Sequence, residues 1–235
     1  MPADLGLDLR NPWSVWTHLF GLVAAVPATI LLLRAVRDDA PRRLTMLIYG
    51  LSMCACFAAS SAYHAAQEPA HIFYRKLDHA AIFLKIAGTN TPIYFTLFHG
   101  WKRWAPIVVL WSLAGVGAAF RLSNEALPDG VNMMIYIGMG WLGFLGYIWA
   151  CRVLSIWQMN WVLLGGAFYT VGAVLDHFRI PVIVPGVWGS HETFHVFVLA
   201  GSLCFYLFIL NNVATFPRQR DLSDPVGFPA VVRAT

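Results

Sequence analysis

Seven apolar stretches, each of about twenty residues, constrain the fold of this chain more than any other feature of its sequence. A stretch of that length can cross the hydrocarbon of a bilayer as one α-helix. The stretches cover residues 13–33, 44–66, 77–98, 104–120, 131–151, 159–175 and 190–216. Lys85 is the only Lys or Arg that lies well inside any of them. The sequence therefore predicts an all-α integral membrane protein built as a seven-transmembrane helix bundle.

The composition and the short connections indicate a single membrane domain. Hydrophobic residues make up 58% of the chain and charged residues 12%, which leaves too little polar surface for a water-soluble fold. We expect a membrane domain over residues 1–216 and a polar tail over residues 217–235. The first stretch has no basic leader and no small-residue cleavage site, so we expect it to be retained. A net charge of +4 without a basic stripe favours membrane lipids over nucleic acid as partners.

Polar side chains gather at one end of the predicted bundle. In a seven-span protein, the end of the second helix, the start of the third, the end of the sixth and the start of the seventh lie at the same membrane face. The polar residues at these four ends are Ser60, His64, Asp78, His79, Asp176, His177, His191 and His195. An ionisable group at membrane depth costs about 2.5–3.5 kcal/mol, so such groups normally face the interior and pair. We therefore expect a polar site inside the bundle near this face.

The segment HETFH at residues 191–195 carries the most specific chemistry. His191 and His195 are four residues apart, so both imidazoles lie on one helix face and can bind one metal ion, most often zinc. Adding His64 from the second helix gives three histidine ligands and one open position, as in catalytic zinc centres. HETFH also matches the HExxH motif of metalloproteases, in which the position of Glu192 supplies the base.

Three segments resemble the haemolysin III proteins, the bacterial branch of the progestin and adipoQ receptor family that includes the adiponectin receptors. They are SSAYH at residues 60–64, KLDHAAIFLKIAGTNTP at 76–92 and HETFHVFVLAGS at 191–202, and the resemblance starts at NPWSVWTHLFG in the first span. One departure is Asn90, which stands where the family has an aromatic residue. The loop at residues 179–189 is also longer than in bacterial members.

The resemblance implies a seven-helix bundle in which zinc is bound by His64, His191 and His195. It further implies that Asp78 holds the zinc-bound water and that Ser60 lies beside this group. The position of Glu192 varies in the family, so the HExxH match is interpreted as fortuitous and Glu192 as a carboxylate at the rim. The wider superfamily includes alkaline ceramidases, which cleave lipid amides with the same constellation.

The leading functional hypothesis is zinc-assisted hydrolysis of a lipid amide or ester, with a sphingolipid-like or fatty-acyl substrate entering from the bilayer. Zinc polarises the carbonyl and lowers the pKa of its bound water to about 7. Asp78 accepts the proton and later delivers it to the leaving amine. Ser60 orients Asp78 or donates to the developing oxyanion.

Three other functions stay open at this point. The first is a receptor or stress-response membrane protein in which zinc only ties the second, third and seventh helices together. The second is the cytolytic role that the haemolysin name implies, although the chain has no export signal. The third is an intramembrane metalloprotease of the site-2 type, with HETFH as its motif and Asp129 as a distant ligand; the order of these motifs is reversed relative to that family.

Several further polar residues have two interpretations each. His18 and Asn11 in the first span either donate hydrogen bonds to the ligating imidazoles or join helices by ordinary hydrogen bonds. Asp176 either extends the polar site or only ends a helix at the interface. Lys85 lies seven residues after Asp78 and hence on the same helix face, two turns deeper. There it lines a cavity or neutralises a carboxyl group.

The loop charges predict the orientation in a bacterial inner (cytoplasmic) membrane. Five basic residues lie on the side of the N-terminus: Arg10, Arg75, Lys76, Arg121 and Arg179. Ten lie on the other: Arg34, Arg37, Arg42, Arg43, Lys102, Arg103, Arg152, Arg218, Arg220 and Arg233. The positive-inside rule therefore places the C-terminus in the cytoplasm, whereas resemblance to the adiponectin receptors implies the opposite.

The orientation is testable with two reporters fused after Thr235. We expect a fluorescent protein to fluoresce and alkaline phosphatase to stay inactive, because the face with ten basic residues, against five on the other, should remain in the cytoplasm. Active phosphatase at this position would restore the receptor-like orientation.

Overall fold

The computed structural model describes residues 9–123 and 129–217, and these residues form an all-helical bundle. The helices are α1 (Pro12–Ala35), α2 (Ala40–Ala65), α3 (Ala70–Leu97), α4 (Trp101–Ser123), α5 (Asp129–Leu142), α6 (Leu145–Ala150), α7 (Ile156–His177) and α8 (Ser190–Phe208), followed by the π-helical turn η1 (Ile209–Val213). The predicted tail lies outside the described residues, apart from Pro217. The all-α prediction is confirmed.

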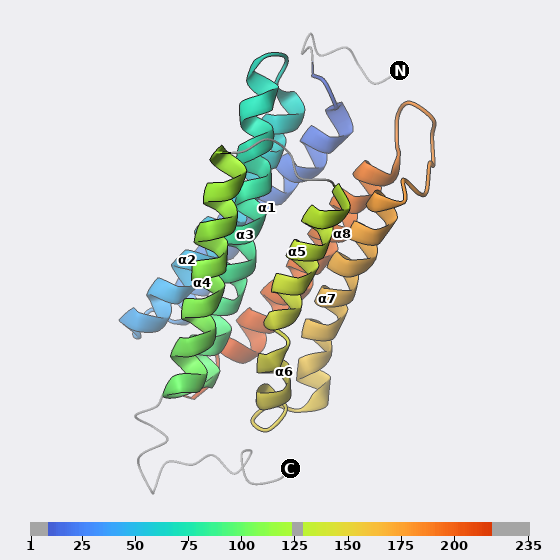
Figure 1. Cartoon of the computed structure of the whole chain (residues 1–235). Coiled ribbons are helices and arrows are strands. Elements are labelled where there is room, and N and C mark those ends of the chain that lie inside the picture. Colours follow the sequence, from blue (N-terminus) through green and yellow to red (C-terminus); the bar gives the residue numbers. More distant parts are fainter. Residues whose placement is uncertain (1–8, 124–128, 218–235) are drawn as a thin grey trace, which may run out of the picture.

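Among the described residues, five helical segments are long and apolar enough to cross a membrane. They are α1, α2, α4, the segment Gly130–Ala150 formed by α5 and α6, and the segment Ser190–Val213 formed by α8 and η1. The two remaining long helices, α3 and α7, run alongside them (Figure 1). Together these make the seven helical spans that the sequence predicts.

The fifth span differs from the sequence expectation, because it is broken between α5 and α6. The break lies where Gly143 meets the middle of α3: a Cβ at Gly143 would come within 2.5 Å of the Asn90 side chain. The Tyr94 hydroxyl donates a hydrogen bond to the Gly143 carbonyl at 3.1 Å. Asn90 therefore occupies the part of α3 where the break in the fifth span packs.

Capping residues fix where two of the helices begin. Asp39 accepts a hydrogen bond from the backbone N–H of Arg42 at 3.1 Å, which caps the start of α2. Ser155 and Gln158 form a capping box at the start of α7. Both caps lie at the end of the bundle opposite the N-terminus (Figure 1).

The helices pack so that the first and the last are neighbours. Consecutive pairs from α1 to α4 lie side by side, α7 packs on α8, and α8 also contacts α1. The ends of α2 and α7 and the starts of α3 and α8 emerge at the end that carries the N-terminus (Figure 1), as predicted. The backbone N–H of Asn11 donates to the His64 carbonyl at 3.1 Å and attaches the start of α1 to the end of α2.

Small residues allow the closest approach between α2 and α3. A Cβ at Gly88 of α3 would lie 2.1 Å from the Ser52 hydroxyl oxygen and 2.7 Å from the Ser52 Cβ on α2. Ser52 is itself buried. Helix pairs in membranes gain most of their stability from such tight contacts, because lipid offers no hydrophobic driving force between helices.

Gly88→Ala is expected to destabilise the bundle by about 1–3 kcal/mol, because the added methyl group must push α2 and α3 apart. The midpoint of thermal unfolding in detergent measures this. Gly115→Ala is the matched control, since a Cβ there meets nothing within 4 Å. Equal midpoints for the two variants would contradict the close packing of α2 and α3.

Candidate metal centre

The site is built from the last turn of α2 and the first two turns of α8. His64 lies next to the end of α2, and His191 and His195 lie on one face at the start of α8. The start of α8 is fixed by Glu192, whose carboxylate accepts a hydrogen bond from the backbone N–H of Gly189 at 2.9 Å. This contact sets the direction in which the two histidines point.

Nitrogen atoms of the three histidines converge on one point. One ring nitrogen from each of His64, His191 and His195 lies within 4.8 Å of the others. The Nε2 atoms of His64 and His191 are 3.1 Å apart. Two nitrogens bound tetrahedrally to one zinc ion would be about 3.3 Å apart, given bond lengths of about 2.0–2.1 Å. The predicted meeting of these residues between the second and seventh spans is confirmed, and the cluster fits a metal ion.

Hydrogen bonds orient two of the imidazoles for this role. The Nδ1 of His191 lies 3.2 Å from Oδ2 of Asp176, and Oδ1 of the same carboxylate accepts a hydrogen bond from the Ser190 hydroxyl at 3.2 Å. The Nδ1 of His195 lies 3.0 Å from the Thr17 hydroxyl oxygen, and that hydroxyl donates to the Ser14 carbonyl at 3.0 Å. Each Nδ1–H therefore has an acceptor, and each Nε2 keeps its lone pair for a metal.

The sequence interpretation assigned these supporting roles only in part. Asp176 extends the polar site, which was one of its two interpretations. No role for Thr17 was predicted from the sequence. The only indication in the sequence is that a hydroxyl residue stands next to His18 in an apolar span. His18 has neither expected role: its ring stacks on that of His195 at a centroid distance of 3.7 Å, and neither of its nitrogens has a hydrogen-bond partner among the described residues.

Asp78 and Ser60 lie in the wall of a cavity that also reaches two of the histidines. Ser60, one turn before His64 on α2, is buried, and its hydroxyl lies close enough to Asp78 to interact with the carboxylate. Asp78 lies in the third turn of α3 and is half-buried. Both side chains line the same cavity as His191 and His195. Their catalytic roles stay a prediction. His79, next to Asp78, contacts Arg121 on α4.

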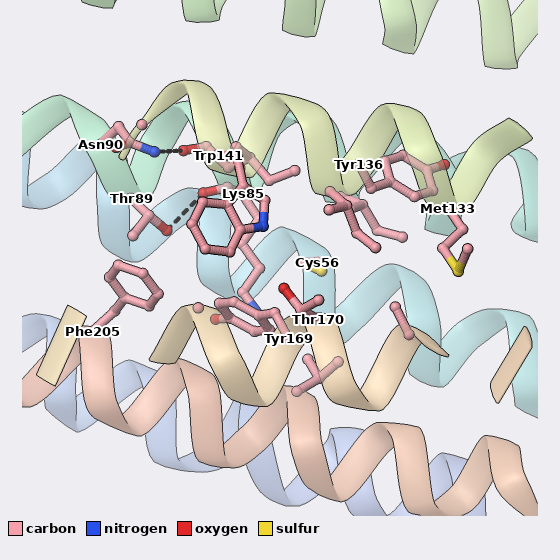
Figure 2. Close-up of a pocket in the computed structure, with 18 of the residues that line it drawn as sticks. Cys56, Lys85, Thr89, Asn90, Met133, Tyr136, Trp141, Tyr169, Thr170 and Phe205 are labelled. Carbon is pink, nitrogen blue, oxygen red and sulfur yellow. Dashed lines mark hydrogen bonds between the residues drawn. The ribbon is translucent and has the colours of Figure 1, made fainter. Parts of the chain in front are cut away.

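The cavity has a volume of about 520 Å³ and runs from the histidines into the interior of the bundle. Its deeper part is bordered by α3, α5, α7 and α8. Figure 2 shows this part, where Lys85 extends from α3 toward Tyr169, with Trp141 and Phe205 nearby. Its walls are mainly apolar, which suits an acyl chain better than a hydrophilic solute.

Glu192 lies outside the cavity. Besides the Gly189 amide, its carboxylate accepts a hydrogen bond from the Ser14 hydroxyl at 2.8 Å, which joins α8 to α1. A carboxylate held in this way ties two helices together and is not free to act as the base of an HExxH protease. The side chain of Asp129, the other residue of the protease hypothesis, lies outside the described part of the chain.

Single alanine substitutions of His64, His191 or His195 are each expected to reduce bound metal from about one ion per chain to near zero, because two imidazoles hold zinc poorly in competition with buffer. Asp176→Asn should lower metal affinity by about 10–100-fold without removing the site, since only the hydrogen bond to His191 changes. Elemental analysis of the detergent-purified protein, with a chelator titration, measures both effects.

His99→Ala is the control, because His99 follows α3 at the opposite end of the bundle and contacts Arg103. Full metal content in the His64→Ala variant would contradict the three-histidine cluster as the metal site.

Comparison with known proteins assigns the chain to a family. A family model described as "Haemolysin-III related" matches residues 9–206. Hemolysin-3 of Bacillus cereus is 29% identical over 198 residues, covering 83% of this chain and 87% of that protein. A Hemolysin-3 homolog of Bacillus subtilis (strain 168) is 28% identical over 197 residues, covering 83% and 90%. The adiponectin receptor protein of Drosophila melanogaster is 24% identical over 217 residues, covering 82% and 48%. This multi-pass membrane protein with a buried histidine cluster therefore belongs to the haemolysin-III related family.

Proposed function

We propose that this protein is a zinc-dependent hydrolase of a lipid amide or ester. The observation that carries the proposal is that a carboxylate shares one cavity with the histidine cluster. Nitrogens of His64, His191 and His195 converge on one point, and Asp78 lines the same cavity as His191 and His195. A purely structural metal site would have no need for a carboxylate that lies beside the ligands on a shared cavity.

His64, His191 and His195 would hold the metal with three protein ligands, the number found in catalytic sites, whereas closed structural sites have four. Bound there, zinc would supply a Lewis acid for the substrate carbonyl and would make water acidic enough to react near neutral pH. Neutral imidazole nitrogens suit this metal, and the partners of His191 and His195 hold both rings in the tautomer that binding needs.

Asp78 performs the proton transfers in the proposed reaction. Its carboxylate accepts a proton from the attacking water and delivers it to the leaving amine or alcohol. The products are a carboxylic acid and an amine or alcohol. Ser60, whose hydroxyl interacts with the Asp78 carboxylate, helps to position it. The alternating roles of one carboxylate balance the protons over the whole turnover.

The surroundings of the site favour a lipid substrate. The outer faces of the helices carry large exposed apolar side chains, as expected of a bundle surrounded by lipid. The cavity walls beyond Asp78 are apolar as well. A substrate with an acyl chain could place the chain among these walls and its amide or ester between Asp78 and the histidines.

Asp78→Asn is expected to keep full metal content and to lose at least about 10²-fold in the rate of hydrolysis of a ceramide-like amide, because the ligands remain and the base is lost. Release of the free acid from a panel of lipid amides and esters measures the rate, and elemental analysis measures the metal.

Glu192→Gln is the matched control, since this carboxylate joins α1 to α8 outside the cavity. We expect it to retain most activity. A Glu192→Gln variant that is inactive beside an active Asp78→Asn variant would favour the protease function. Wild-type protein that hydrolyses no member of the panel would reject the hydrolase. The metal would then be structural, and its removal would only lower the unfolding temperature.

A further inference from the structure

Lys85 is a buried cation in the deep part of the cavity. It lies in the middle of α3, it is 6% exposed, and its side chain lines the cavity wall. Figure 2 shows its amino group reaching from α3 toward Tyr169 on α7. The proposed hydrolysis makes no use of this residue.

The neighbours of Lys85 hold its ammonium group in place without supplying a negative charge. Its Nζ donates a hydrogen bond to the Ser202 hydroxyl on α8 at 2.8 Å. It also lies over the rings of Phe57 and Tyr169, at 4.8 and 5.1 Å from their centroids. The Tyr169 hydroxyl is in turn within 3.1 Å of the Ser202 hydroxyl. Within the described part of the chain, only one of the three N–H groups of the ammonium is therefore engaged by a hydrogen-bond acceptor.

No carboxylate of the described residues lies within ion-pair distance of Lys85. Asp78 is the acid on the same helix face, and seven residues of α-helix separate the two by about 10 Å along the axis. A cation at membrane depth is costly unless an anion or water compensates it, and such residues mark ligand or ion pathways. The missing counter-charge leaves a place for an anionic ligand group in the cavity.

We propose that Lys85 binds the negatively charged end of a single-chain amphiphile whose chain occupies the apolar part of the cavity. The shared chemistry is an anionic oxygen group, either a carboxylate or a phosphate. Two N–H groups of the ammonium remain for it, and the Lys85 side chain lines the cavity, where Ser202 holds its Nζ. The proposal goes beyond hydrolysis, because binding at Lys85 does not require turnover at the metal.

A purely structural Lys85 would behave differently. It would join α3 to α8 through Ser202, and its loss would lower stability without changing which ligands bind. An anion-binding Lys85 instead makes affinity depend on ligand charge. The ratio of affinities for two ligands that differ only in charge separates the two roles.

The test measures binding to the detergent-purified metal-loaded protein, using two matched pairs of ligands. The carboxylate pair is palmitate and methyl palmitate, and the phosphate pair is a lysophosphatidate and the monoacylglycerol of the same chain. Wild-type protein should bind the charged member of at least one pair about tenfold or more tighter than the neutral one, as expected of a charge-assisted hydrogen bond. The preferred pair identifies the anion as a carboxylate or a phosphate.

Lys85→Met should abolish this preference while the affinity for the neutral ligands and the metal content stay unchanged. Lys76→Met is the matched control, because Lys76 lies on the same helix outside the cavity and donates to the Leu122 carbonyl at 3.4 Å. It should keep the full preference. If Lys85→Met does not fold, Tyr169→Phe and Ser202→Ala replace it, and each should reduce the preference several-fold.

Equal binding of the charged and neutral ligands by wild-type protein would overturn the proposal, as would an unchanged preference in Lys85→Met. Neither result depends on hydrolysis. Wild-type protein that hydrolyses lipids but shows no charge preference would refute only the Lys85 proposal. Wild-type protein that shows the preference but hydrolyses nothing would refute only the hydrolase.

Discussion

The high cost of polar groups in hydrocarbon determines where the chemistry of this bundle can lie. Lipid cannot hydrate an imidazole or a carboxylate, so such groups normally turn to the interior of the bundle and pair there. Asp176, Thr17 and Ser60 supply partners for His191, His195 and Asp78 in turn. Because these contacts come from α1, α2 and α7, the site forms only when these helices are correctly positioned against α3 and α8.

Close helix packing fixes these relative positions. Glycines place backbone against side chains at Gly21, Gly50 and Gly88, where an added Cβ would overlap residues of the neighbouring helices. The tightly packed half from α1 to α3 carries Ser60, His64 and Asp78, whereas the cavity opens toward α5 and α7. One wall of the site is therefore fixed by packing, and the other leaves room for a ligand.

The apolar stretches and the position of the polar residues were sufficient to predict the seven spans, the end of the bundle that carries the site and the three converging histidines. The order of the spans predicts which helix ends share a membrane face, and helical periodicity predicts that His191 and His195 share a helix face. The break at Gly143 was not predictable, because it arises from contact with Asn90 and Tyr94 on another helix. The stacking of His18 on His195 and the hydrogen bond from Thr17 depend on the rotation of α1 against α8, which no local pattern encodes.

The contacts between α1 and α8 also determine when the site can form during synthesis. Ser14 and Glu192, like Thr17 and His195, are 178 residues apart in the chain, and His64 and His191 are 127 apart. A ribosome delivers the first helix to the membrane long before the last. Two of the three imidazoles are absent until that last helix is inserted, so the nascent chain has no complete site with which to capture metal. A metal bound by these three histidines would therefore be loaded late in biogenesis, after insertion has brought the two ends of the sequence together.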